Sequence, residues 1–318
     1  MLEELIKILG SENIKENEPM KDHTTLRIGG PARYFAIVDS EDKLISLLEY
    51  LDKKAYPYYL VGNGSNLLVS DSGYNGVIIK LDGEFKDIKC VLSEEEEIAG
   101  DTLVDTAFIS AGAASMLSQI ASVALDNSLM GMEFASGIPG TLGGAILMNA
   151  GAYTGEMKDI VASVRILEKG MDGSYVVREY SNANMKFGYR TSVLKTHKGI
   201  VLSASLKLIL GDYERIKSTM NDLNTQRREK QPLEFPSAGS TFKRPMGQFA
   251  AKLISEANLK GLRVGDAMVS TKHAGFCINA GNASAADFKR LMDLIIQKVF
   301  LSSGVKLEPE VILLGEFR

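Results

Sequence analysis

The first eighty residues alternate between helical and strand-like hydrophobic patterns. Leu2, Leu5, Ile6 and Leu9 recur at helical spacing, and Ser40 offers an N-cap to a second segment with leucines on one face. Between and after these segments, short runs alternate in polarity or are rich in aromatic and β-branched residues, as strands are. The predicted helices cover residues 1–9 and 41–54, and the predicted strands cover residues 33–38, 56–62, 67–71 and 76–81. From residue 33 to residue 81 the predicted order is strand, helix, strand, strand, strand.

The pattern after residue 87 is again mixed. A strand-like run leads into a helix with Met116, Leu117 and Ile120 on its apolar side. The turn sequence GMDG separates two strands over 161–169 and 174–180, which predicts a hairpin. A further strand is expected at 199–210. The uncharged stretch 134–155 between them carries six glycines and reads as buried loop and strand.

A different region begins near residues 210–220, where we place a domain boundary. A helix is predicted over 214–232, ended by Pro232. Then follow a strand near 240, a helix over 248–257, a strand near 275, a long helix over 285–301, and a final strand pair broken at Pro309.

Composition narrows the class of protein. Of 318 residues, 45% are hydrophobic and 24% are charged, as in a soluble globular protein, and the net charge of −4 argues against nucleic acid as a partner. No run of apolar residues is long enough to span a membrane, and the N-terminus does not resemble a signal peptide. Cys90 and Cys277 form no disulfide framework, and the three histidines lack metal-ligand spacing. We therefore expect a cytoplasmic protein without a metal.

Two glycine-rich segments are candidates for ligand binding. GNGSN (62–66) lies between two predicted strands, where successive backbone N–H groups could hold an anion; a plain hairpin turn is the alternative. SGIPGTLGGAILMNAGAY (136–153) has glycines three or four apart and no charge, which suits backbone laid against a flat or phosphate-bearing ligand; a packing turn is the alternative. Two such segments together favour a dinucleotide.

Three further segments carry reactive side chains. FGYRTSVLK (187–195) contains Arg190, a fork-shaped donor for carboxylate or phosphate, although a surface ion pair is the default interpretation. SAGSTFKRP (237–245) contains Ser240 without a nearby histidine base, so it does not indicate a hydrolase. LEPEV (307–311) contains Glu308 and Glu310; two carboxylates on one terminal strand are usually exposed to solvent, so a catalytic role is the alternative to a plain surface position.

The six segments follow one another in an order that resembles a known family. HTTLRIGGPA, YYLVGNGSNLLVSD, GIPGTLGGAILMNAGAYTGEM, FGYRTSVLK, PSAGSTFKRP and LEPEVILLG together resemble the UDP-N-acetylenolpyruvoylglucosamine reductases, from about residue 20 to the C-terminus. The short segment between Arg190 and Ser240 resembles the type II branch of that family. Arg244 and Gly275 depart from its commonest pattern.

The resemblance implies an α+β fold: a two-lobed vanillyl-alcohol-oxidase-type (PCMH-type) FAD-binding module followed by an α+β substrate-binding domain. The implied division is a first FAD-binding lobe with the N-terminal helix (1–86), a second FAD-binding lobe (87–213) and a substrate-binding domain whose C-terminal strand returns to the active site (214–318).

The resemblance also implies an activity and its site. It implies NADPH-dependent reduction of UDP-N-acetylglucosamine enolpyruvate to UDP-N-acetylmuramate, in peptidoglycan biosynthesis, through non-covalent FAD. Hydride would pass from NADPH to FAD and then to C3 of the enolpyruvyl group. The partners would be the UDP-sugar and NADPH, and the protein would be a monomer.

The family's functional residues carry over onto matching positions. The catalytic ones would be Ser240, which would protonate C2, Arg190, which would face the substrate carboxylate, and Glu310, which lies beside that carboxylate in the family. Tyr189 and Lys243 would contact the uridine diphosphate. The FAD contacts would be Gly62, Asn63, Gly64, Ser65, Asn66, Ser136, Gly137, Pro139, Gly140, Gly144 and Asn149.

Overall fold

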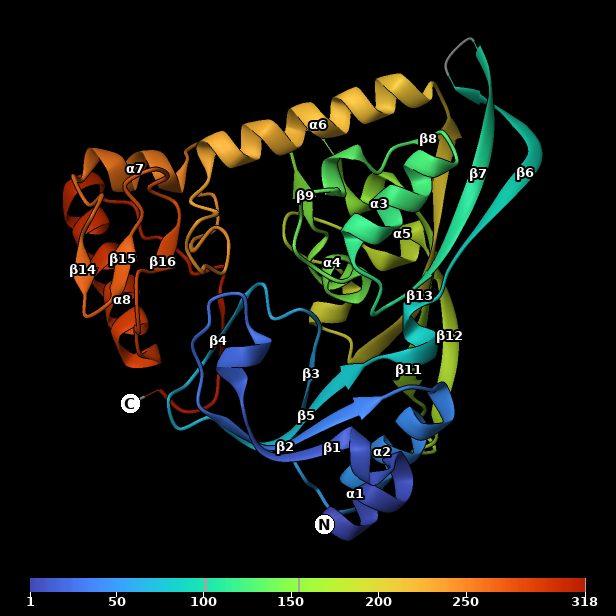
Figure 1. Ribbon diagram of the computed structural model, residues 1–318, viewed down its shortest axis with the longest axis horizontal. Helices are drawn as coiled ribbons and strands as arrows, with labels where there is room; N and C mark the ends of the chain where they lie inside the picture. Colours follow the sequence, from blue (N-terminus) through green and yellow to red (C-terminus); the bar gives the residue numbers. More distant parts are fainter. Residues whose placement is uncertain (100–101, 154, 318) are drawn as a thin grey trace. The chain divides into compact units, whose positions relative to one another are not determined.

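The computed structural model describes residues 1–99, 102–153 and 155–317, and it contains both helices and sheets (Figure 1). The helices are α1 (Leu2–Leu9), α2 (Glu41–Lys53), α3 (Leu117–Asp126), α4 (Leu142–Met148), α5 (Asn182–Met185), α6 (Tyr213–Lys230), α7 (Ala250–Glu256) and α8 (Ala285–Ser303).

The longer strands are β1 (Ile14–Pro19), β2 (Pro31–Val38), β3 (Tyr58–Val61), β5 (Tyr74–Leu81), β6 (Ile88–Ala99), β7 (Thr102–Gly112), β11 (Val161–Lys169), β12 (Tyr175–Ser181) and β13 (Gly199–Leu210). The shorter ones are β4 (Leu67–Val69), β8 (Leu129–Met130), β9 (Gly151–Ala152), β10 (Gly155–Glu156), β14 (Arg263–Val264), β15 (Ala267–Val269), β16 (Cys277–Asn279) and β17 (Ile312–Leu314).

The chain divides into two compact units. Unit 1 comprises Met1–Asn13, Ile37–Tyr56 and Ile79–Gln226; unit 2 comprises Ile14–Ala36, Pro57–Ile78 and Arg227–Arg318. A four-stranded sheet has the order β1-β2-β5-β3, and the division falls inside β2 and β5. The bounds of these compact units do not correspond to the functional segments 1–86, 87–213 and 214–318, which stay a prediction.

Unit 1 is built on a sheet with the order β12-β11-β13-β7-β6, to which β8 adds at β13. The predicted hairpin is confirmed, since β11 and β12 pair antiparallel from Lys169↔Tyr175 onward. Helices α3 and α4 pack against this sheet (Figure 1). The helix α4 was not predicted, because its first turn contains two glycines, which lower helix propensity; packing against β7 and β13 helps to compensate.

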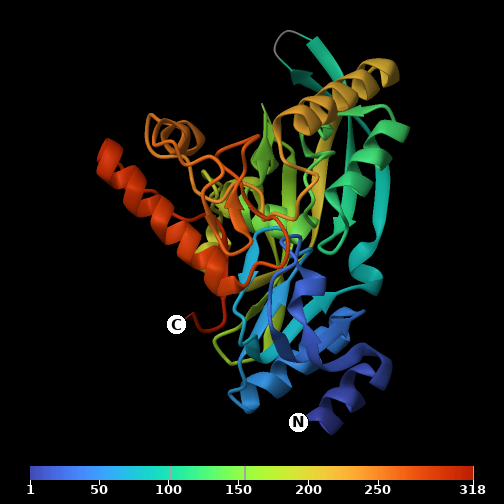
Figure 2. The same ribbon diagram turned by 60° about the vertical axis from the view of Figure 1, so that its left-hand side comes forward.

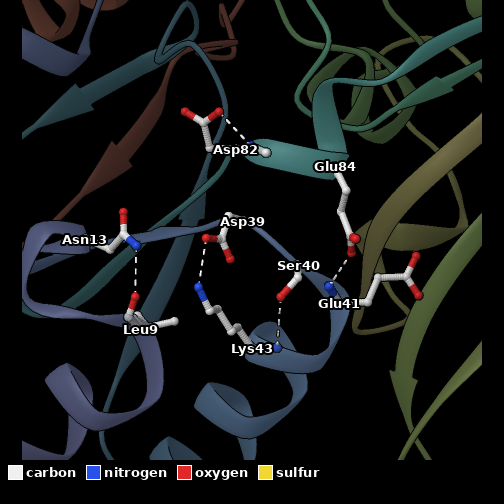
Figure 3. A network of polar contacts seen from close by, with 9 residues as sticks. Leu9, Asn13, Asp39, Ser40, Glu41, Lys43, Asp82 and Glu84 are labelled. Atoms are coloured by element: carbon white, nitrogen blue, oxygen red, sulfur yellow. Dashed lines mark hydrogen bonds and ion pairs between the residues drawn. The ribbon is translucent and has the colours of Figure 1, made fainter.

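The N-terminus of α2 is capped as its sequence predicts, in unit 1 (Figure 3). Ser40 Oγ accepts a hydrogen bond from Lys43 N at 3.5 Å, and Glu84 accepts one from Glu41 N at 2.5 Å. Two oxygen acceptors therefore satisfy backbone donors that the first turn of a helix leaves unpaired. The predicted apolar stripe of α2 is fully buried; it consists of Leu44, Leu47, Leu48 and Leu51.

Unit 2 has its core between α8 and a three-stranded sheet of order β14-β15-β16. Both views show α8 running along this sheet (Figure 2, red). Its buried stripe includes Phe288, Leu291 and Ile295, as the sequence predicts. Asp71 accepts hydrogen bonds from the backbone N–H groups of Ala285 and Ala286, which anchors the start of α8 to the end of β4.

The C-terminal strand was predicted wrongly in one respect. Among the described residues of the tail it has no partner strand; β17 instead pairs parallel with β4, with Ile312 opposite Leu67. Near residue 240, where a strand was expected, the described residues form only single bridges, Ser237↔Ile278 and Phe242↔Pro309. Pairing between segments so distant leaves no periodic signal in either one.

Candidate active site

The turn GNGSN lies in unit 2 and needs its central glycine. Gly64 is buried and has φ +60°, and a Cβ atom there would lie 2.1 Å from the carbonyl oxygen of His23. The turn is also held by a hydrogen bond from Thr25 N to Gly64 O of 3.3 Å. Gly62 is exposed, and Asn63, Ser65 and Asn66 are half-buried. The turn therefore presents exposed backbone and small polar side chains, which is the donor set that a pyrophosphate requires.

Ser240 and Glu310 lie on neighbouring segments of unit 2. The N–H of Glu310 donates to the carbonyl oxygen of Thr241, at 2.8 Å, and Thr241 directly follows Ser240. Thr241 is itself buried, and its Oγ1 accepts a hydrogen bond of 2.9 Å from Cys277 N. Ser240 is exposed and Glu310 half-buried. A hydroxyl and a carboxyl are thus carried by two segments that share a backbone hydrogen bond.

Lys243 extends this arrangement by one further pair. Its N–H donates to Glu308 O, and its Nζ lies 3.2 Å from Glu308 Oε2. Both side chains are substantially exposed, so this ion pair contributes little to stability, about 0–1 kcal/mol. A phosphate group could therefore replace Glu308 as the partner of Lys243 at small cost.

Asn66 ends the turn and points toward the C-terminal segment. Its Nδ2 donates to Glu310 O at 3.0 Å, and its own carbonyl oxygen accepts from Ile312 N at 3.0 Å. Thr25, a residue without a predicted role, donates a hydrogen bond from its Oγ1 to Ser237 O at 2.7 Å. The only sequence signal for Thr25 was its place in the HTTLRIGGPA segment.

The second glycine-rich segment lies in unit 1, around α4. Gly144 is exposed, and a Cβ atom there would meet only Thr141 Oγ1, at 3.6 Å. Pro139 is exposed and Gly137 half-buried, whereas Gly140 is buried. The first turn of α4 therefore offers uncovered backbone without charge, which fits a flat or phosphate-bearing cofactor.

Two polar residues of this segment are engaged within unit 1. Ser136 Oγ donates to Glu133 O at 2.9 Å and accepts from Asn224 Nδ2 at 3.2 Å. Asn149 is fully buried with φ +42°. The contact of Asn149 with a cofactor stays a prediction, and its side-chain amide already has hydrogen-bond partners within unit 1.

Asn149 connects the glycine-rich segment to the turn that carries Arg190. Its Nδ2 donates to Glu156 Oε2 at 2.6 Å and to Gly188 O at 3.1 Å, and its Oδ1 accepts from Lys158 N at 2.9 Å. On the other side of the turn, Ser192 Oγ donates to Leu147 O at 3.0 Å.

The Arg190 turn is closed by two hydrogen bonds between the backbones of Gly188 and Thr191. Arg190 itself has φ +53°, and its guanidinium carbon lies 5.3 Å from the centre of the Tyr189 ring. Tyr189 is exposed. The structure thus brings the 136–149 segment, Tyr189 and Arg190 together in unit 1, and residues 62–66, Ser240, Lys243 and Glu310 together in unit 2.

Burial raises the pKa of the Cys277 thiol to about 12, so it holds its proton at neutral pH. Among the residues that the structure describes, no group of histidine, cysteine, aspartate and glutamate could hold a metal ion. Nor does any helix in the described ranges have the length and apolarity to cross a membrane.

Comparison with known proteins first gives the class. Residues 32–177 match a model described as "FAD binding domain", and residues 231–314 match "UDP-N-acetylenolpyruvoylglucosamine reductase, C-terminal domain". A crystal structure of the UDP-N-acetylenolpyruvylglucosamine reductase from Thermus caldophilus is similar, with a TM-score of 0.75, 36% identity, and coverage of 95% of this chain and 100% of that one. The chain is an FAD-dependent oxidoreductase.

Full-length relatives then give the family. The UDP-N-acetylenolpyruvoylglucosamine reductase of Caldanaerobacter subterraneus subsp. tengcongensis is 47% identical over 99% of this chain and 98% of the relative. That of Clostridioides difficile is 46% identical over 98% of this chain and 97% of the relative. The chain belongs to the UDP-N-acetylenolpyruvoylglucosamine reductase family. The family resemblance, the fold class and the FAD cofactor inferred from the sequence are confirmed.

Proposed function

We propose that this protein reduces UDP-N-acetylglucosamine enolpyruvate to UDP-N-acetylmuramate with electrons from NADPH, as a step of peptidoglycan biosynthesis. The observation that carries the proposal is the hydrogen bond between Glu310 N and Thr241 O, which joins the segments of the predicted proton donor and carboxyl. The names of the full-length relatives support the choice of substrate.

The cofactor fits the residues that would hold it. Bound FAD would supply the transfer of hydride from NADPH to C3 of the enolpyruvyl group. In unit 2, the backbone of the turn 62–66, which is exposed at Gly62, would bind the pyrophosphate, with Ser65 and Asn63 adding side-chain donors. In unit 1, the uncovered backbone at Gly144 would lie against the cofactor, and Gly137, Pro139 and Gly140 would border it.

Two side chains of the protein would stabilise the negative charge that develops on the substrate and supply the proton to C2. Negative charge develops at C2 of the substrate and spreads into its carboxylate. Arg190 would bind that carboxylate with its planar fork and stabilise the charge. Ser240 would deliver the proton to C2 from Oγ; an enolate is a strong base, so a hydroxyl suffices as the acid.

Glu310 would donate a hydrogen bond to the same carboxylate if protonated, which requires a raised pKa. Tyr189 and Lys243 would contact the uridine diphosphate. For Lys243, the exposed pair with Glu308 supports this part, since the ammonium group is already at the surface.

Three finer inferences belong to the same proposal. The segments 1–86, 87–213 and 214–318 would serve as two FAD-binding lobes and a substrate-binding domain. The protein would act in the cytoplasm, as a monomer without nucleic acid or membrane partners. Sedimentation equilibrium of the FAD-loaded protein tests the monomeric state, because a dimer would show twice the mass of one chain.

Product analysis tests the activity. FAD-loaded protein is incubated with NADPH and UDP-N-acetylglucosamine enolpyruvate, and the sugar nucleotide is followed by mass spectrometry. We expect NADPH oxidation to depend on the substrate, with conversion to UDP-N-acetylmuramate. NADPH oxidation that consumes oxygen and leaves the sugar nucleotide unchanged would instead identify an oxidase.

A further inference from the structure

Asn66 is the last residue of the GNGSN turn, yet its side chain is directed to another segment. The amide Nδ2 lies 3.0 Å from the carbonyl oxygen of Glu310, a residue 244 positions away in the sequence. Both residues belong to unit 2. A side chain at the end of the expected pyrophosphate turn is therefore bonded to the backbone of the predicted catalytic carboxyl.

The peptide units of Glu310 are held from both directions. Its N–H donates to Thr241 O at 2.8 Å, and its C=O accepts from Asn66. The residue before it, Pro309, has no N–H to donate, and the ladder between β17 and β4 begins only at Ile312. Ahead of the ladder, the backbone of Glu310 is therefore held by these two hydrogen bonds, and the preceding residues are held by the Lys243 N to Glu308 O hydrogen bond and the Phe242↔Pro309 bridge.

The backbone of Asn66 reinforces the same contact. Its carbonyl oxygen accepts from Ile312 N at 3.0 Å, immediately before Leu67 pairs with Ile312 in the parallel ladder. The side chain and the main chain of Asn66 thus engage two residues of one C-terminal segment. A shift of the turn would move Glu310 with it.

We propose that Asn66 is a positioning residue for Glu310 rather than a ligand of the cofactor, which revises its sequence-based assignment. The inference rests on the proposed function, in which Glu310 faces the substrate carboxylate. Through Asn66, the turn that binds the cofactor also sets the place of the carboxyl that acts on the substrate.

A double-mutant cycle tests this inference. Asn66→Ala removes the donor to Glu310 O, Glu310→Gln removes the carboxyl, and the double variant carries both changes. For each protein, FAD affinity is measured by titrating the apoprotein, and the two half-reactions are measured separately in a stopped-flow instrument. Asn63→Ala, in the same turn, is the matched control for cofactor binding.

For Asn66→Ala we expect FAD affinity within about threefold of wild type, and reduction by NADPH within about twofold. Reoxidation by the enolpyruvyl substrate should slow by about tenfold or more, because the carboxyl is misplaced. In the Glu310→Gln background, Asn66→Ala should add less than about twofold, since the two residues act as one unit. Asn63→Ala should lower FAD affinity equally in both backgrounds.

Two results would overturn the inference: a loss of FAD affinity of about tenfold or more in Asn66→Ala, or full additivity of the two changes. If Asn66→Ala does not fold, Asn66→Leu keeps about the size of the side chain and removes the donor to Glu310 O without adding a charge beside the expected pyrophosphate. It should show the same selective loss of reoxidation. Wild-type protein that the enolpyruvyl substrate cannot reoxidise would refute the proposed function, independently of any Asn66 variant.

Discussion

Each of the two glycine-rich segments contains an asparagine whose amide donates to a distant carbonyl oxygen, but the two asparagines are held differently. In unit 2 the turn 62–66 ends at Asn66, whose amide donates to Glu310 O. In unit 1 the segment 136–153 contains α4, which ends at Asn149; the amide of Asn149 donates to Gly188 O, in the turn that carries Arg190. Each segment therefore combines partly exposed backbone, which we propose for cofactor binding, with an asparagine that is hydrogen-bonded to a segment carrying a predicted catalytic residue.

The difference lies in burial and in the distance along the chain. Asn149 is fully buried, its amide group contacts three partners, and Gly188 is 39 residues away. Asn66 is half-buried, and Glu310 is 244 residues away. A buried amide with every group bonded contributes to folding itself, so replacing Asn149 would destabilise unit 1 as well as moving Arg190. Asn66 is better suited to separating positioning from stability.

The largest expected effect concerns Ser240, the proposed proton donor in unit 2. Ser240→Ala should slow reoxidation by the enolpyruvyl substrate by about 10²–10⁴, the usual contribution of a positioned general acid. Reduction by NADPH involves no proton transfer to C2 and should stay near wild type. Stopped-flow absorbance measures both steps. Reoxidation within about twofold of wild type would mean that water or another group protonates C2.

The next effect concerns the fold of the turn in unit 2. Gly64→Ala should lower the free energy of unfolding by about 2–4 kcal/mol, from the left-handed backbone and the contact with His23 O. The matched control is Gly304→Ala, where φ is +72° and nothing lies within 4 Å. It should cost only about 1 kcal/mol. Equal losses in urea unfolding would show that the contact with His23 relaxes freely.

The corresponding test in unit 1 is Arg190→Lys. The charge is kept and the bidentate fork is lost, which should slow reoxidation by about tenfold or more. Reduction by NADPH should change little. A similar slowing of both half-reactions would assign Arg190 a structural part in its turn.

Parts of both regions could be predicted from the sequence, and the reason is locality. The stripe on α8, the hairpin β11–β12 and the cap at Ser40 depend on residues close together in the chain, and all three appear as expected. Other features depend on residues far apart in the chain and were not predicted. These are the parallel pairing of β17 with β4 and the hydrogen-bond acceptors of Asn66 and Asn149. An asparagine amide suits a cofactor and a distant carbonyl equally well, so only the tertiary structure distinguishes them.

The smallest effect concerns the support of the unit 1 segment. The carbonyl oxygen of Ser115 accepts a hydrogen bond from Leu142 N, but the buried hydroxyl of Ser115 has no hydrogen-bond partner among the described residues. Ser115→Ala should therefore leave stability unchanged or raise it by up to about 1 kcal/mol. Ser192→Ala, which removes the buried donor to Leu147 O, should cost about 1 kcal/mol. Thermal unfolding compares them; equal destabilisation would mean that the Ser115 hydroxyl is bonded in solution.

The central claim is that the enolpyruvyl sugar nucleotide, and not oxygen, accepts the electrons. Its most direct test is an anaerobic two-step titration of the yellow, FAD-loaded protein. NADPH should bleach the flavin absorbance, and UDP-N-acetylglucosamine enolpyruvate added without oxygen should restore it completely. Colour that returns only when oxygen is admitted would contradict the claim.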